Sequence, residues 1–146
     1  MYKSEDNLVR RLVQQLRGDR SPWGGAKVFL EFNYQRGRAD VVALTDNDDH
    51  LIAFEAKLRK WREALHQAYR NTCFAHSSYV VVPRCVALTA QHYEAEFRSR
   101  NVGLCYVESN RIVLVFRAEK QTPLEPWLVE TASAAARGYQ HGARRS

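Results

Sequence analysis

Three charged residues interrupt two apolar segments near the centre of the chain. Asp40 precedes the segment VVAL, and Glu55 and Lys57 end the segment LIAFEAK. Both segments are rich in residues typical of strands, and the turn formers TDNDDH (45–50) separate them, so residues 38–57 predict a β-hairpin. Side chains alternate along a strand, which puts Glu55 and Lys57 on one face, and antiparallel pairing brings Asp40 close to both. Two carboxylates and one ammonium are therefore expected to converge.

A pair of carboxylates at short range predicts a bound cation. Two such charges a few ångströms apart repel by about 1 to 4 kcal/mol in partly hydrated surroundings, and a cation or a shared proton relieves this. Mg²⁺ (or Mn²⁺) suits Asp40 and Glu55, because Mg²⁺ commonly takes one or two carboxylates and fills its other positions with water and phosphate oxygens. The main-chain carbonyl of Ala56 is a further candidate ligand. Lys57 would orient or deprotonate a water and neutralise charge on a phosphate, so the set predicts phosphodiester hydrolysis.

The residues before the hairpin predict one helix and one strand. Ser4, followed by acidic residues, is typical of a helix N-cap. Leucines then recur at helical spacing until Gly18, so this first helix is amphipathic. The loop 18–25 is rich in Gly and Pro, and residues 27–34 alternate apolar and polar side chains as a strand does.

The residues after the hairpin predict further helices and strands. Apolar residues recur at helical spacing from Leu58 to Tyr69, and residues 77–83 form a short apolar strand ended by a proline. Thr89 is expected to cap a helix that runs to about Arg100. Residues 102–116 predict a terminal hairpin that turns at Ser109 and Asn110. The order αβββαβαββ indicates an α/β (α+β) fold with a central mixed β-sheet flanked by helices.

Length and charge indicate one domain with a basic tail. The 146 residues suffice for a single core, which we place at residues 1–130. Residues 131–146 are expected to be a basic tail, partly helical or disordered, with a short helix over 127–138. The net charge is +6, but the tail has three arginines and no acid, which leaves 19 basic against 16 acidic residues elsewhere, or +3. Charge alone therefore favours a polyanionic partner only weakly.

The three cysteines and the absence of long apolar segments predict a cytoplasmic protein. The cysteines are odd in number and widely spaced, which favours buried free thiols over disulfides or a metal site. No segment has the length and hydrophobicity of a signal peptide or a transmembrane helix, so no membrane partner is expected.

The order of these elements resembles the PD-(D/E)XK nuclease superfamily, which has the restriction-endonuclease-like fold. The resemblance rests on a helix with Glu, a strand with Asp, a strand with Glu-x-Lys, and a following helix and strand, over roughly residues 4–83. It implies that Asp40 and Glu55 bind the metal and that Lys57 assists the attacking water. Ala39 stands where many members have proline, a departure that the family tolerates.

The same resemblance implies two further site residues. Many members add an acidic residue from the first helix, for which Glu5 is the best match as a third metal-binding residue and Asp6 the reserve. Several also place a glutamine in the helix after the motif, and Gln67 fits that position, with Tyr69 as its companion. An acidic residue in a first helical turn is, however, equally explained by the helix dipole.

The expected partner is nucleic acid, in particular DNA. Basic residues gather beside the predicted site and are candidates for contacts with phosphates: Arg38, Arg59, Lys60, Arg62 and Arg70. The expected function is Mg²⁺-dependent endonuclease activity on DNA phosphodiesters, in repair, recombination or defence.

The three charged residues are also compatible with a structural ion-pair network at the edge of a sheet. The chain is alternatively a catalytically inactive module with the same fold, which binds nucleic acid or a partner protein as a subunit of a larger assembly. Neither a homodimer nor a preference for DNA over RNA, or for single over double strands, follows from these residues.

Overall fold

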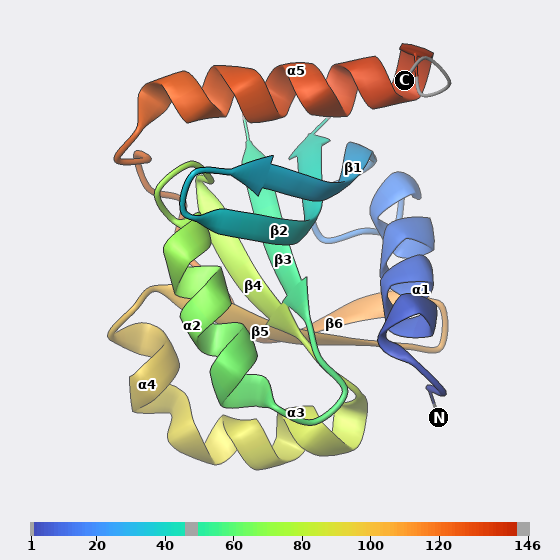
Figure 1. The fold of residues 1–146 in the computed structure, drawn as a ribbon. Helices are drawn as coiled ribbons and strands as arrows, with labels where there is room; N and C mark the ends of the chain where they lie inside the picture. Colours follow the sequence, from blue (N-terminus) through green and yellow to red (C-terminus); the bar gives the residue numbers. More distant parts are fainter. Residues whose placement is uncertain (1, 46–49, 143–146) are drawn as a thin grey trace.

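The computed structural model describes residues 2–45 and 50–142. The chain folds into a mixed α+β structure built on one six-stranded sheet (Figure 1). Its strands are β1 (Ala26–Tyr34), β2 (Gly37–Thr45), β3 (Leu51–Ala56), β4 (Ser77–Val81), β5 (Val102–Glu108) and β6 (Arg111–Phe116). Its helices are α1 (Glu5–Arg17), α2 (Trp61–Asn71), α3 (Arg84–Ala90), α4 (Glu94–Arg98) and α5 (Pro126–Gly142), with a single 3₁₀ turn (Gln91–Tyr93) between α3 and α4.

The strands lie in the sheet in the order in which they occur along the chain. Antiparallel pairing joins β1 to β2, β2 to β3 and β5 to β6, whereas β3, β4 and β5 run parallel. The parallel connections are made through α2 and through the α3–α4 segment, as crossovers between parallel strands require. The expected mixed sheet flanked by helices is therefore confirmed.

Helix α1 begins and packs as its sequence predicts. The Ser4 side chain accepts a hydrogen bond from the main-chain N–H of Asn7 at 3.2 Å, which satisfies one of the free amides of the first turn. Leu8, Leu12 and Leu16 are fully buried, one turn apart on the same face. Their burial fixes α1 against one face of the sheet.

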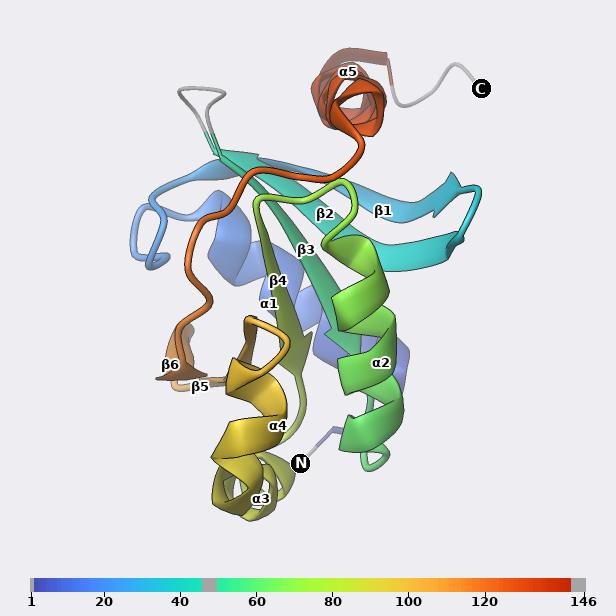
Figure 2. The same cartoon turned by 90° about the vertical axis from the view of Figure 1, so that its left-hand side faces the viewer.

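The sheet separates two helical layers, as the two views in Figures 1 and 2 show. The α1 leucines pack with residues of the central strands such as Val41 and Phe54. The opposite face is covered by α2 and the α3–α4 segment at one end and by α5 at the other. Buried residues on both faces explain why β3 and β4 are continuously apolar apart from Glu55 and the serines of β4.

The C-terminal helix is longer than expected and is part of the core. It continues to Gly142, so the boundary expected at residue 130 falls within α5. Ala132 and Ala136 are fully buried, because their small side chains allow the helix to lie close against β1 and β2, where they contact the cluster that contains Phe32 and Leu44. This close fit is a property of the tertiary packing rather than of an amphipathic pattern.

Two other expectations are corrected. The helix expected to begin at Thr89 begins at Arg84, and the Thr89 hydroxyl donates within α3 to the Cys85 carbonyl at 3.3 Å. Pro83 follows β4 and is the N-cap residue of α3, with an extended backbone (φ −62°, ψ 156°). Of the three free cysteines, Cys73 and Cys105 are buried as expected, but Cys85 is exposed.

The terminal hairpin forms as predicted. Ser109 and Asn110 have φ angles of 53° and 59°, the left-handed pair that a two-residue turn of type I′ requires. Glu108 and Arg111 are the pair that closes it. Within the described residues, none of the helices is both long and apolar enough to span a membrane.

Candidate active site

The predicted site lies where β2 and β3 separate. Their antiparallel pairing is confirmed from Leu44–Leu51 to Val41–Phe54, and it ends there; residues 46–49 of the expected turn lie outside the described residues. Beyond this point the side chain of Asp40 replaces a strand partner. Its Oδ2 accepts a hydrogen bond from the main-chain N–H of Ala56 at 2.9 Å. Asp40 is thereby anchored to the end of β3.

A distortion of β1 accompanies this separation. Glu31 has a φ of 54°, in the left-handed region that residues other than glycine rarely adopt. The β2 partners of its two neighbours, Val41 opposite Leu30 and Ala39 opposite Phe32, lie on different faces of the sheet. Val41 belongs to the core cluster under α1, whereas Ala39 belongs to the cluster under α5. The regular alternation of β2 is therefore broken at Asp40, which frees its side chain to reach β3.

Glu55 is a buried carboxylate with a defined donor. It is 1% exposed, and its Oε2 accepts a hydrogen bond from Asn71 Nδ2 at 2.7 Å. Burial is the main reason that its pKa rises to about 8, and the nearby charge of Asp40 raises the pKa further. The two carboxylates are therefore close enough to interact, and this proximity disfavours the ionised form of Glu55 in the absence of a cation.

Lys57 follows β3 directly, and its ammonium pairs with a carboxylate of α2. Its main-chain N–H donates to the Val81 carbonyl at 3.2 Å, which extends the pairing with β4 by one residue. Its Nζ lies 2.9 Å from Glu63 Oε1 on α2. The hydrogen bond with Glu63 raises the pKa of Lys57, and the charges of Glu5 and Asp40 act in the same direction. Lys57 is therefore an ammonium at neutral pH.

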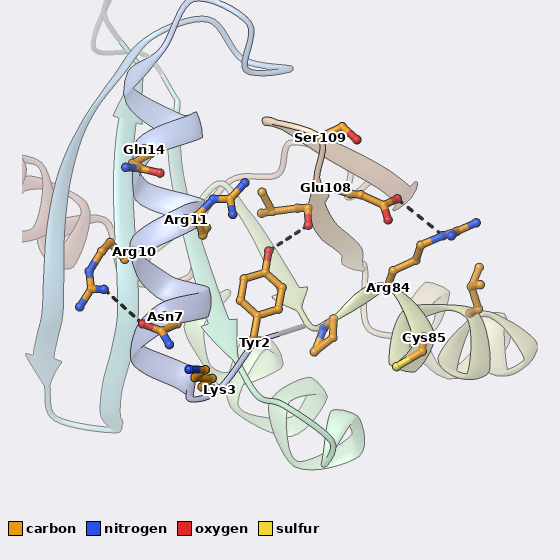
Figure 3. A pocket seen from close by; sticks show the side chains of 13 residues that line it. Tyr2, Lys3, Asn7, Arg10, Arg11, Gln14, Arg84, Cys85, Glu108 and Ser109 are labelled. Carbon is orange, nitrogen blue, oxygen red and sulfur yellow. Dashed lines mark hydrogen bonds and ion pairs between the residues drawn. The ribbon is translucent and has the colours of Figure 1, made fainter.

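A cleft of about 600 Å³ opens between α1 and the β1–β2 hairpin, and Glu5, Asp40 and Ala56 line it. The structure thus brings Glu5 to the same cleft as Asp40, 35 positions apart in the sequence. On its other side, α1 borders a second and larger groove (Figure 3).

The α2 residue that reaches Glu55 is Asn71 rather than Gln67. Gln67 is partly buried on α2, whereas Asn71, one turn later, is fully buried and donates to Glu55. The Tyr34 hydroxyl donates in turn to Asn71 Oδ1, so the amide is held from both ends. A signal for Asn71 was present in the sequence: it continues the buried stripe that includes Leu65 and Ala68, where a polar residue needs a partner.

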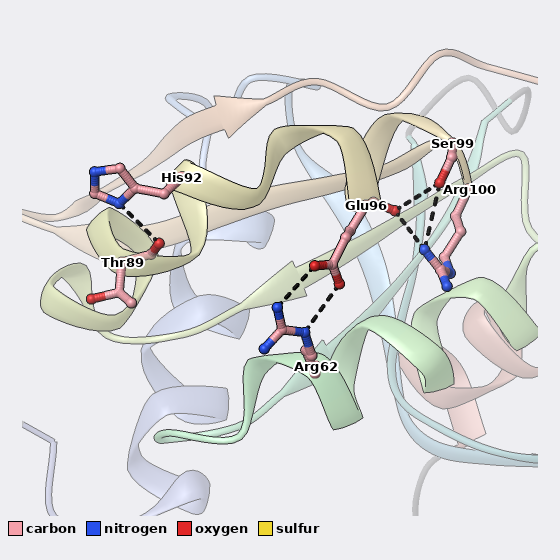
Figure 4. A network of polar contacts seen from close by, with 6 residues as sticks. All are labelled: Arg62, Thr89, His92, Glu96, Ser99 and Arg100. Carbon is pink, nitrogen blue, oxygen red and sulfur yellow. Dashed lines mark hydrogen bonds and ion pairs between the residues drawn. The ribbon is translucent and has the colours of Figure 1, made fainter.

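The basic residues expected to bind nucleic acid do not form one surface. Arg62 is turned toward α4, where it donates to both carboxylate oxygens of Glu96 at 2.9 and 3.1 Å (Figure 4). Its guanidinium also stacks 4.4 Å from the Trp61 ring centroid. The contact with Glu96 connects α2 to α4, and the two contacts together hold the guanidinium of Arg62 away from the site.

The other four predicted cations have different surroundings. Arg38 lines the cleft and lies 3.8 Å from Glu31. Arg59 and Lys60 are exposed in the segment between β3 and α2. The Arg70 guanidinium packs against Gly37, where a Cβ would lie 2.9 Å from it.

Sequence reasoning missed two arginines of α1 that line the cleft. Arg10 and Arg17 lie two turns apart on the helix and face the same cleft as Asp40. Their spacing of seven residues on the polar side of an amphipathic helix was the available signal.

The donor set suits Mg²⁺ if most ligands come from water and substrate. Among the described residues, no group of three or more Asp, Glu, His or Cys side chains is close enough to hold a metal ion by itself. Asp40 and Glu55 supply two carboxylates, and each has one oxygen engaged by an N–H donor. Two carboxylates are what Mg²⁺ commonly takes at sites where phosphate oxygens complete its shell. The pair therefore fits this ion, and the metal assignment stays a prediction.

Replacing Asn71 by alanine is expected to reduce the free energy of unfolding by about 1 to 3 kcal/mol, because Glu55 loses its donor and Tyr34 its acceptor. Tyr34→Phe removes only one of these bonds and should cost less. Urea unfolding measures both. Gln67→Ala is the matched comparison on the same helix, and a larger loss for Gln67→Ala than for Asn71→Ala would contradict the role given to Asn71.

Comparison with known proteins indicates the fold but no family, since no family model and no curated protein matches the chain. A protein of unknown function from Silicibacter pomeroyi has a similar structure, with a TM-score of 0.61 and 19% identity over 95% of this chain and 92% of that one. A repair endonuclease from Pyrococcus abyssi has a TM-score of 0.51 and 16% identity over 74% of this chain. The match covers 49% of the endonuclease, so this chain corresponds to about half of it. The mixed α+β fold is consistent with a nuclease-like fold.

Proposed function

We propose that this protein is a Mg²⁺- or Mn²⁺-dependent nuclease of the PD-(D/E)XK type that hydrolyses phosphodiester bonds of DNA. The observation that carries the proposal is the convergence of Asp40 and Glu55 where β2 and β3 separate, with Lys57 directly after. The stability of the fold has no need of this arrangement, because a buried carboxylate beside a second one is unfavourable. The likeness to a repair endonuclease agrees with it at the level of the fold.

Each residue has a separate task in this proposal. A divalent cation held by Asp40 and Glu55 would supply Lewis-acid polarisation of a phosphate oxygen. Asn71 orients the Glu55 carboxylate through its bond to Oε2. Lys57, kept protonated by Glu63, stabilises the negative charge that grows on the phosphate. Glu5, which lines the same cleft, would support the site through water.

The reaction is the addition of water across a P–O ester bond. The water oxygen bonds to phosphorus, the bond to the leaving oxygen breaks, and a proton is delivered to that oxygen. The Lys57 ammonium is positioned to hold the attacking water or to donate to the phosphate, and its raised pKa favours this role over that of a base. From the sequence, Lys57 could either orient the attacking water or deprotonate it. The contact with Glu63 favours orientation, because it keeps the ammonium protonated.

The nucleic acid would enter through the cleft between α1 and the β1–β2 hairpin. Arg10, Arg17 and Arg38 line this cleft around Asp40 and provide positive charge for the phosphate backbone. Arg59 and Lys60 extend this charge past Lys57. Phosphate contacts of this kind position a strand without reading its sequence.

Metal titration tests the proposal most directly. Isothermal titration calorimetry with MgCl₂ or MnCl₂ should show binding to the unmodified protein and none to Asp40→Asn. The control is Glu130→Gln, which removes an exposed carboxylate of α5. Cleavage of plasmid and of labelled oligonucleotides in the same buffers should follow metal binding.

The competing function is a catalytically inactive module that binds nucleic acid or a partner protein. If metal binding is absent, or is unchanged in Asp40→Asn, the nuclease proposal fails and the inactive module is favoured. Nucleic-acid binding without any metal-dependent cleavage would likewise favour the inactive module over the nuclease.

A further inference from the structure

The larger of the two grooves beside α1 has no role in the proposed reaction. It has a volume of about 790 Å³ and lies between α1, the beginning of α3 and the β5–β6 turn (Figure 3). Arg10 and Gln14 line both this groove and the cleft that contains Asp40. Helix α1 is therefore a shared wall, and a chain leaving the cleft over α1 enters this groove. We name it the α1–α3 groove.

The α1–α3 groove is strongly basic. Four cationic side chains line it, Lys3, Arg10, Arg11 and Arg84, against the single acid Glu108, which gives a balance of four minus one, or +3. Glu108 lies 3.7 Å from Arg84 and offsets that charge.

Arg10 and Arg11 each donate to a neutral side chain. Arg10 donates to the Asn7 side chain at 3.1 Å and Arg11 to that of Asn110 at 3.3 Å. These bonds orient the two guanidinium groups without neutralising them. They hold positive charge on the α1 wall of the groove.

The aromatic ring of Tyr2 lies among the cationic side chains of the groove. The Tyr2 hydroxyl donates to the Val107 carbonyl at 2.9 Å, which fixes the ring between α1 and the end of β5 (Figure 3). The side chain is only half-buried and lines the groove together with Leu88. Fixed aromatic rings among cationic side chains are the arrangement by which proteins hold single-stranded nucleic acid, with bases stacked on the rings and phosphates on the cations.

The exposed part of the Tyr2 ring favours one strand over two. Bases of a single strand are free to stack on an aromatic side chain, whereas bases within a duplex stack on one another. We infer that the α1–α3 groove binds a single-stranded segment of nucleic acid that continues from the cleft, with phosphates on Arg10 and Arg11 and a base against Tyr2. This inference rests on the proposed function and names the form of its substrate.

Binding is tested by fluorescence anisotropy with a labelled oligo(dT) of about 12 nucleotides, a length within the usual range for such sites. The measurement is made in EDTA, where no metal-dependent cleavage occurs. Arg11→Ala should lower the slope of log K against log salt by about 0.7, the loss of one phosphate contact on a single strand. Tyr2→Leu should weaken binding about tenfold, and Tyr2→Phe, which keeps the ring but loses the bond to Val107, should weaken it less. Lys120→Ala removes one exposed charge after β6 and should change neither quantity.

Cys85 provides a local reporter of occupancy. It lines the groove and is exposed, whereas Cys73 and Cys105 are buried. Oligo(dT) should slow the alkylation of Cys85 by iodoacetamide several-fold, as followed by mass spectrometry, and a duplex of the same length should not. The protection should be lost in Arg11→Ala/Tyr2→Leu.

The outcomes separate this inference from the proposed function. Equal alkylation of Cys85 with and without oligo(dT), equal effects of Arg11→Ala and Lys120→Ala, or equal protection by the duplex would each overturn the inference. None of these results bears on metal-dependent cleavage by the unmodified protein. Protection of Cys85 without such cleavage would support single-strand binding in the α1–α3 groove and would refute the proposed nuclease activity.

Discussion

Replacement of Lys57 by alanine is expected to lower the rate of phosphodiester cleavage about 100- to 1,000-fold, the usual cost of removing one donor that stabilises negative charge in the transition state. The metal affinity measured by calorimetry should persist, because Asp40 and Glu55 are retained. The rate is expected to fall because Lys57 directly follows β3, where the charges of Glu5 and Asp40 raise the pKa of its ammonium. Initial rates on a labelled oligonucleotide at saturating Mg²⁺ measure the effect.

Two controls distinguish a catalytic role of Lys57 from a structural one. Lys120→Ala removes an equal charge from an exposed site elsewhere and should leave the rate unchanged. Glu63→Gln weakens the contact that holds the Lys57 ammonium at 2.9 Å, while it keeps the ammonium itself, so its effect should be smaller than that of Lys57→Ala. An unchanged rate in Lys57→Ala would remove this residue from the mechanism.

The hairpin that carries the site was predictable because its determinants are local. The apolar segments around Asp40 and Glu55 have strand composition, and turn formers separate them, so antiparallel pairing followed. The same reasoning predicted the burial of the α1 leucines and the terminal hairpin at Ser109. These features depend on residues close together in the sequence.

The precise contacts of the site were not predictable because they depend on tertiary structure. The left-handed backbone of Glu31 has no sequence signal, since glutamate rarely adopts it. Glu55 and Asn71 meet only because α2 packs back over β3, and Arg62 finds its partner Glu96 on α4, 34 residues away. Resemblance to a family favoured Gln67, whereas the buried stripe of α2 identifies Asn71.

The two core layers explain why an unfavourable pair of carboxylates is tolerated. The strands that carry Asp40 and Glu55 are buried from both sides, by α1 and by α2 with α5, so their backbone has little freedom to move the charges apart. The packing thus keeps the Asp40 and Glu55 carboxylates close together, and a bound cation would relieve their repulsion. Such stored strain is typical of functional sites.

Glu55→Gln is expected to abolish metal-dependent cleavage and at the same time to stabilise the metal-free protein at about pH 8. The amide oxygen of glutamine still accepts the bond from Asn71, but the substitution removes a buried charge beside Asp40. Because folding raises the pKa of Glu55 from 4.5 to about 8, the folded protein binds more protons than the unfolded chain between these values. Its stability therefore falls as the pH rises through this window.

The pH dependence of stability between these two pKa values can be measured directly. Urea unfolding of the metal-free protein at about pH 5 and about pH 8 should show a loss of stability with pH that is reduced in Glu55→Gln. Each unit of pKa corresponds to about 1.4 kcal/mol, so the difference is at most a few kcal/mol. Glu130→Gln, at an exposed position of α5, should keep the pH dependence.

Because Mg²⁺ would offset the same repulsion, its addition should stabilise the unmodified protein at about pH 8 and leave the stability of Glu55→Gln unchanged. Equal pH dependence in Glu55→Gln and the unmodified protein would show that Glu55 is not held in an unfavourable state.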